Sequence, residues 1–136
     1  MLLSLAALFV SAEENDNSIE QKDYVSAEEA LRLLMEGNSR YVSGIITQNG
    51  QNVVERRYEL ISGQDPLAVV LGCSDSRIPP EMIFDQGLGD IFVVRTAGQV
   101  LDNASLGSIE YAVEHLEEPL IIVMGHEGCG AVTATL

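Results

Sequence analysis

Three unbroken apolar runs in the second half of the chain predict buried β-strands. They cover residues 67–71, 91–94 and 120–124, are rich in Val, Ile and Leu, and show no alternation with polar residues. A strand that is covered on both faces carries such a run, whereas a half-exposed strand alternates apolar and polar positions. We therefore expect these runs to be neighbouring strands inside a sheet.

Helical segments separate the three runs. Pro79 opens a short helix over residues 79–84, since proline is favoured at a helix start. Residues 103–116 form a longer helix with one buried face. The apolar positions of that face are Leu106, Ile109, Val113 and Leu116. Buried strands that alternate with helices indicate right-handed crossovers, so the predicted fold class is α/β, a parallel β-sheet core flanked by helices.

Two further helices are expected ahead of the first strand, as an N-terminal helical arm. Ser26 followed by Glu29 is a capping-box pattern, which starts a helix near Ser26. Asn52 and Glu55 repeat the pattern, and Gly63 is placed to end the second helix. The apolar positions are Leu31, Leu34, Met35 and Tyr41 in the first helix, and Val54, Tyr58 and Ile61 in the second.

The first 25 residues are interpreted as two segments outside the domain. Leu2 to Val10 is an apolar run, too short to cross a bilayer, which needs about 20 apolar residues. Its length and the small residues behind it are typical of a signal peptide over residues 1–12, although no Lys or Arg precedes it. Export to the periplasm or the medium would follow. If the run is an ordinary apolar helix or follows a mispredicted start, the protein would be cytoplasmic. Residues 13–25 are polar and acidic and are interpreted as a mobile linker.

Length and charge limit the class of protein. The chain has 136 residues, room for one domain, which we place at residues 26–136. Its formal net charge of −14 excludes nucleic acid and anionic membranes as favoured partners. No later segment is long and apolar enough to span a membrane. The chain stops at Leu136 just as residues 131–134 begin to look helical, so we expect a fragment whose C-terminal part is missing.

The chemistry-bearing residues follow two of the predicted strands. Cys73-Ser74-Asp75-Ser76-Arg77 comes after the first strand, and His126-Glu127-Gly128-Cys129-Gly130 after the third. Ligands bind at the carboxyl ends of parallel strands, where these segments converge. Two sulfurs and one imidazole suit Zn²⁺, and Asp75 can complete the tetrahedron or leave a position for water. A site of that kind is catalytic in type.

Alternative chemistries account for these residues less completely. Cys73 and Cys129 could form a disulfide in an exported protein, which would leave His126 unexplained. A phosphatase loop needs a wider spacing between its Cys and Arg than the three residues that separate Cys73 from Arg77. A phosphate-binding P-loop would begin at Gly125, but the chain has Ala131-Val132 where that loop needs Lys and Ser or Thr. His126 alone would more often be a core residue, and His115 is interpreted as a surface residue.

Taken together, these motifs resemble the β-class carbonic anhydrases of the plant-like subgroup. The similarity runs from about Ala27 to the last residue. It rests on the segments Cys73-Ser74-Asp75-Ser76-Arg77, Ile78-Pro79, Val94-Arg95, Ala97-Gly98, Ile109-Glu110-Tyr111-Ala112-Val113 and Gly125-His126-x-x-Cys129-Gly130. The resemblance implies reversible hydration of CO₂ to bicarbonate and a proton, by attack of a zinc-bound hydroxide, with one Zn²⁺ per chain.

The resemblance also implies roles for individual residues. The zinc ligands would be Cys73, His126 and Cys129, with Asp75 and Arg77 as the catalytic pair. Asp75 would also stand among the metal residues and would accept a hydrogen bond from the hydroxide, while Arg77 would hold its carboxylate away from zinc. The substrate-binding residues would be Gln64, Phe92, Ala97, Tyr111 and the Gly130 N–H. In the family this pocket is shared across a dimer interface, so we expect a homodimer or a larger homo-oligomer.

Two departures from the family pattern change what is expected of this chain. Glu127 adds a negative charge beside the metal, where a small hydroxyl residue is common. The family's C-terminal helices and final strand have no counterpart, so the sheet edge that they cover would be bare. A hydrolase for carbonyl sulfide or carbon disulfide and a zinc-bound but inactive scaffold stay open as alternatives.

Overall fold

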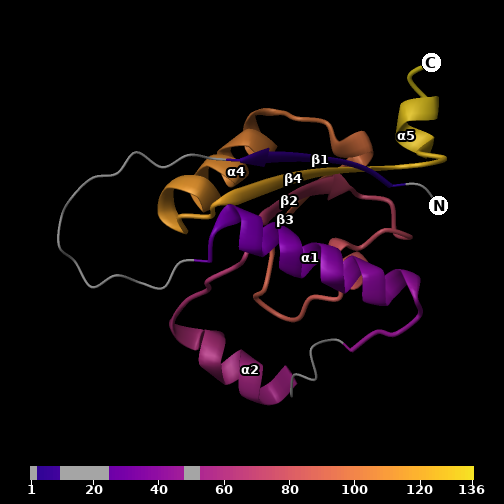
Figure 1. Ribbon diagram of the computed structural model, residues 1–136. Coiled ribbons are helices and arrows are strands. Elements are labelled where there is room, and N and C mark those ends of the chain that lie inside the picture. Colours follow the sequence, from indigo (N-terminus) through magenta and orange to yellow (C-terminus); the bar gives the residue numbers. More distant parts are fainter. Residues whose placement is uncertain (1–2, 10–24, 48–52) are drawn as a thin grey trace.

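The computed structural model describes residues 3–9, 25–47 and 53–136. It contains a four-stranded sheet with the strand order β1-β4-β2-β3 (Figure 1). The strands β2 (Val69–Cys73), β3 (Phe92–Thr96) and β4 (Leu120–His126) are parallel, while β1 (Leu3–Phe9) runs antiparallel to β4. The predicted α/β fold with a parallel sheet flanked by helices is therefore confirmed.

Helices cover both faces of the sheet (Figure 1). On one face α1 (Ala27–Val42) and the short α3 (Pro80–Ile83) pack over a core that contains Leu34, Phe84 and Ile122. On the other face α4 (Asn103–His115) buries Ile109 and Ala112 against β2 and β3. The remaining elements are α2 (Val53–Glu59), η2 (Leu60–Ser62), η3 (Ala97–Gln99) and α5 (Gly130–Thr133).

Helix α1 begins where the sequence places it and packs unusually close to the loop after α3. The Ser26 hydroxyl accepts a hydrogen bond from the Glu29 N–H at 3.2 Å, which caps the helix. Gly37 is buried in the same helix, and a Cβ built on it would overlap the carbonyl oxygen of Phe84. The two backbones can approach this closely because residue 37 is a glycine.

Two helices differ from the expected burial. In α4 the buried side is formed by Ser105, Ile109 and Ala112, whereas Leu106 is 40% exposed, so the prediction for Leu106 is wrong. The face of α4 that packs on the sheet therefore runs through Ser105 and not through Leu106. Helix α2 forms as expected, although its Asn52 start lies outside the described residues. The predicted apolar face of α2 and η2 is exposed in this chain, at Val54, Tyr58 and Ile61.

Strand β1 comes from the apolar run at the N-terminus. Leu3 lies opposite His126 and Phe9 opposite Leu120, so β1 follows β4 along its whole length. The alternative of an N-terminal helix is therefore wrong for residues 3–9, and β1 covers the β4 edge of the sheet. The signal-peptide assignment stays a prediction, and most of the acidic linker lies outside the described residues. Among the helices described, none has the length and apolar character needed to cross a bilayer.

Candidate metal centre

The ends of two adjacent parallel strands bring the three candidate ligands together. Cys73 is the last residue of β2 and His126 the last of β4, and the register pairs Gly72, one residue before Cys73, with Met124, two residues before His126. Cys129 follows a tight turn in which Gly128 has a φ of 65°. As a result, one ligand atom from each of Cys73, His126 and Cys129 lies within 4.8 Å of the other two.

The chemistry of this cluster fits a metal ion such as zinc. Cys73 and Cys129 are 3% and 8% exposed, and both are free thiols with their Sγ atoms 3.9 Å apart. The His126 side chain is 1% exposed, and within the described part of the chain its Nε2 has no hydrogen-bond partner. Its other ring nitrogen, Nδ1, lies 3.1 Å from the Glu127 carbonyl oxygen, which can fix the tautomer that leaves Nε2 as a ligand. A buried unpartnered nitrogen beside two sulfurs is the donor set of a zinc site.

Hydrogen bonds prepare Cys73 to bind a cation. Burial raises the pKa of its thiol, but hydrogen bonds, above all from the backbone N–H groups of Gly98 and Asp75, lower that pKa from 9.0 to about 7. The Gly98 N–H lies 3.2 Å from the Cys73 Sγ. Because the thiolate is the form that binds metal, a large share of Cys73 is ready to coordinate at neutral pH.

Asp75 and Arg77 form a two-point ion pair at the rim of the cluster. The Arg77 Nε and Nη2 donate to the two carboxylate oxygens at 2.8 and 2.7 Å, and the Arg77 backbone N–H donates to Oδ1 at 3.0 Å. These bonds to Arg77 hold the pKa of Asp75 well below its usual range, so the carboxylate is charged at neutral pH. Its Oδ2 lies 3.8 Å from the His126 Nε2, while Arg77 also donates to the Gly128 carbonyl at 3.3 Å.

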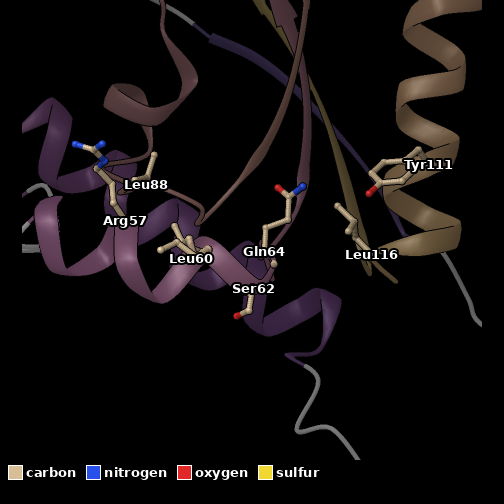
Figure 2. Close-up of a pocket in the computed structure, with 9 residues that line it drawn as sticks. Arg57, Leu60, Ser62, Gln64, Leu88, Tyr111 and Leu116 are labelled. Carbon is tan, nitrogen blue, oxygen red and sulfur yellow. The ribbon is translucent and has the colours of Figure 1, made fainter.

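The residues predicted to bind substrate fall into two separate groups. Ala97 and Gly130 are close to the cluster in the chain, since Ala97 precedes Gly98 and Gly130 follows Cys129. Gln64 and Tyr111 instead line an open hollow of about 660 Å³, together with Leu60, Ile61 and Leu116 among others (Figure 2).

Phe92 belongs with the second group. Its ring centroid lies 6.2 Å from that of Tyr111. Phe92 opens β3, four residues before Thr96, which pairs with Cys73. At about 3.3 Å per residue, it lies roughly 13 Å along the strand from the cluster. Within one chain, the hollow and the metal cluster therefore lie toward opposite ends of the sheet.

One functional contact was missed by the sequence analysis. The Gly98 N–H that lowers the pKa of Cys73 comes from the turn after β3, a segment that carries no metal-ligating side chain. The sequence did hold a signal for this contact. Ala97-Gly98 lies shortly after the predicted strand at residues 91–94, and the turn after a neighbouring parallel strand opens at the same edge of the sheet as the cluster.

The comparisons with known proteins all indicate the same family. A family model described as carbonic anhydrase matches residues 68–136. A carbonic anhydrase of Mycolicibacterium smegmatis is 59% identical over 107 residues, which cover 79% of this chain and 52% of that protein. Carbonic anhydrase 2 of Mycobacterium tuberculosis is 58% identical over the same length, covering 79% of this chain and 51% of that protein. The chain thus spans about half the length of the curated relatives it matches.

Solved structures give the same result. A β-carbonic anhydrase of the fungal pathogen Aspergillus fumigatus aligns with a TM-score of 0.56 and 31% identity, covering 76% of this chain and 50% of that one. One of two tetrameric β-carbonic anhydrases from Sordaria macrospora aligns with a TM-score of 0.55 and 30% identity, covering 76% and 52%.

Proposed function

The chain belongs to the β class of the carbonic anhydrase family, and from this membership we propose that it catalyses the zinc-dependent reversible hydration of CO₂ to bicarbonate and a proton. One observation carries the proposal: the buried cluster of Cys73, His126 and Cys129, in which the His126 Nε2 has no hydrogen-bond partner among the described residues. A buried nitrogen without a hydrogen-bond partner needs an explanation. A metal ion held by this nitrogen and the two sulfurs would provide one.

Cys73, His126 and Cys129 would hold one zinc ion per chain. Three firm protein ligands leave the fourth tetrahedral position for a small molecule, which is the arrangement of a catalytic site rather than a structural one. Zinc bound there would supply an acidified water as the nucleophile for CO₂. The low pKa of Cys73 favours this loading, because its thiol gives up its proton near neutral pH.

Asp75 and Arg77 would orient the nucleophile without entering the reaction. The Asp75 carboxylate stays charged and lies beside the His126 Nε2, so one of its oxygens can accept a hydrogen bond from the attacking water. Arg77 holds both oxygens of that carboxylate, so it would keep Asp75 from becoming a ligand of a bound zinc ion. The Gly130 N–H would donate to the bicarbonate product, and Ala97 would form part of the apolar CO₂ pocket.

We further propose that the pocket is completed by a second copy of the chain. Gln64, Phe92 and Tyr111 gather around one hollow, far from the metal cluster of the same chain. They can line a CO₂ pocket beside the metal only if a partner brings its hollow to this cluster. The exposed apolar residues Tyr58 and Ile61, next to that hollow, are a suitable surface for such a contact.

Zinc content and CO₂ hydration test the proposed function together. We expect one zinc per chain by elemental analysis, and hydration above the buffer rate in a stopped-flow assay with a pH indicator. Cys129→Ser should lose zinc and activity, whereas the control Ser108→Ala, which removes a hydroxyl that bonds to the Ala104 carbonyl oxygen of the same helix, should keep both. A wild-type chain that binds no zinc, or a zinc-loaded oligomer without hydration activity, would contradict the proposal. Light scattering tests the dimer separately.

A further inference from the structure

Arg95 holds the backbone of the loop that carries two of the site residues. It lies on β3 opposite Gly72, one residue before Cys73. Its Nε donates to the Cys73 carbonyl oxygen at 2.9 Å, and its Nη2 donates to the Asp75 carbonyl oxygen at 2.7 Å. The guanidinium therefore bridges the two residues whose side chains provide a thiolate and the orienting carboxylate.

The charge of Arg95 is not used in an ion pair. Arg32, Arg40, Arg56 and Arg77 each pair with a carboxylate. Among the residues that the structure describes, no carboxylate lies within ion-pair distance of the partly buried Arg95 side chain. Arg95 instead directs two of its N–H groups at main-chain carbonyl oxygens of the loop after Cys73.

Hydrogen bonds tie the loop after Cys73 to β3. It leaves the sheet at Cys73 and reaches α3 only at Pro80. Between these points the Ser74 N–H donates to the Thr96 carbonyl oxygen at 2.9 Å, and Arg95 supplies the two bonds already described. Strand β3 carries no ligand itself, yet it fixes the direction in which the loop presents its side chains.

We propose that Arg95 is a positioning residue of the metal centre, which holds the Cys73 and Asp75 carbonyl groups so that the two side chains meet His126 and Cys129 in ligating geometry. The inference rests on the proposed function. In this arrangement the two arginines have different roles. Arg77 holds the carboxylate of Asp75, and Arg95 holds the main chain on either side of Ser74. Lysine cannot replace Arg95 fully, because a single ammonium lacks the planar fork that reaches both carbonyl groups.

The test measures zinc affinity and ligand geometry in the full chain, independently of activity. Zinc affinity is read by competition with a chromophoric chelator, and geometry by the thiolate and d–d absorption bands of the cobalt-substituted protein. Residues that support metal ligands typically change metal affinity by about 10–100-fold when replaced. We expect a loss of that size and a changed cobalt spectrum for Arg95→Met, with partial recovery in Arg95→Lys.

Two controls separate this role from a loss of charge or of stability. Arg32→Met removes an exposed charge on α1, and Ile109→Ala destabilises the core on the α4 face of the sheet, in a cluster that contains neither Cys73 nor Cys129. Both should keep the wild-type cobalt spectrum. If Arg95→Met and Arg95→Lys bind zinc like the wild type with unchanged cobalt bands, the inference is overturned, even if both unfold at lower temperature. If Arg95→Met does not fold, the Arg95→Lys spectrum decides. A wild-type chain without zinc affinity would instead overturn the proposed function.

Discussion

The same substitution, Gly to Ala, should have opposite effects on stability at two helical positions. At Gly37 in α1, an added Cβ would overlap the Phe84 carbonyl oxygen and lie 2.7 Å from its carbonyl carbon. At Gly107 in α4, a Cβ would meet no atom within 4 Å outside its own helix. The local backbone preference is the same at both sites and favours alanine by up to about 1 kcal/mol.

The steric cost decides the sign at Gly37. The carbonyl group of Phe84 is main chain and cannot rotate away, so α1 must move away from it before ordinary contact is restored. Overpacking of this kind typically costs about 1–3 kcal/mol, which exceeds the gain in helix propensity. We expect Gly37→Ala to lower the free energy of unfolding by about 1–2 kcal/mol, or the Tm by about 4–8 °C. Gly107→Ala should raise the free energy of unfolding by about 0.4–1 kcal/mol.

Urea unfolding followed by far-UV circular dichroism measures both variants against the wild type, and an unchanged m-value shows that the transition is comparable. If Gly37→Ala were as stable as the wild type, the close approach of α1 to the loop after α3 would be refuted. If Gly107→Ala were destabilised to the same degree as Gly37→Ala, a general effect of the substitution would account for the result instead.

Three further predictions concern the site and its surroundings. Asp75→Asn should keep zinc and lower CO₂ hydration by about 10–100-fold in the stopped-flow assay, because the orienting carboxylate is lost; full activity would show that Asp75 does not orient the nucleophile. Arg77→Met should also lower hydration, since the freed Asp75 can move onto the metal. Its cobalt derivative should then show an added oxygen ligand, and a wild-type spectrum would contradict this. For pH, Ser105 lowers the pKa of Asp102 below the ordinary 3.8 through its backbone N–H and hydroxyl. The stabilising cap is thus present above that value and is lost as the carboxylate protonates below it. In acid titrations Asp102→Asn, which caps without titrating, should therefore lose less stability than the wild type below about pH 4, and parallel losses would refute the role of the cap.

Much of the core fold could be predicted because its signals are local. Ser26 caps α1 with its own side chain, and the three apolar runs become the three parallel strands. The metal cluster was predictable for a related reason, since the ends of neighbouring parallel strands open at one edge and bring Cys73 to His126. The residue pattern and the chain topology therefore predict the same position for the cluster.

What the sequence analysis missed depends on contacts between distant segments. Nothing in residues 3–9 identifies β4 as their partner strand, because an apolar run of that length suits a strand, a helix or a targeting signal equally. The orientation of α4 was misjudged at Leu106, since small residues such as Ala112 are buried without a strong hydrophobic signal. The separation of Gln64 and Tyr111 from the metal cluster also required the folded structure.

The pairing of β1 with β4 joins two segments that lie far apart along the chain. The ribosome releases Leu3 long before its partner His126, so the segment at residues 3–9 cannot pair with β4 until β4 has been made. In that interval its apolar residues are open to any chaperone or translocation factor that binds such sequences. Strand β1 can therefore complete the sheet only after β4 has left the ribosome.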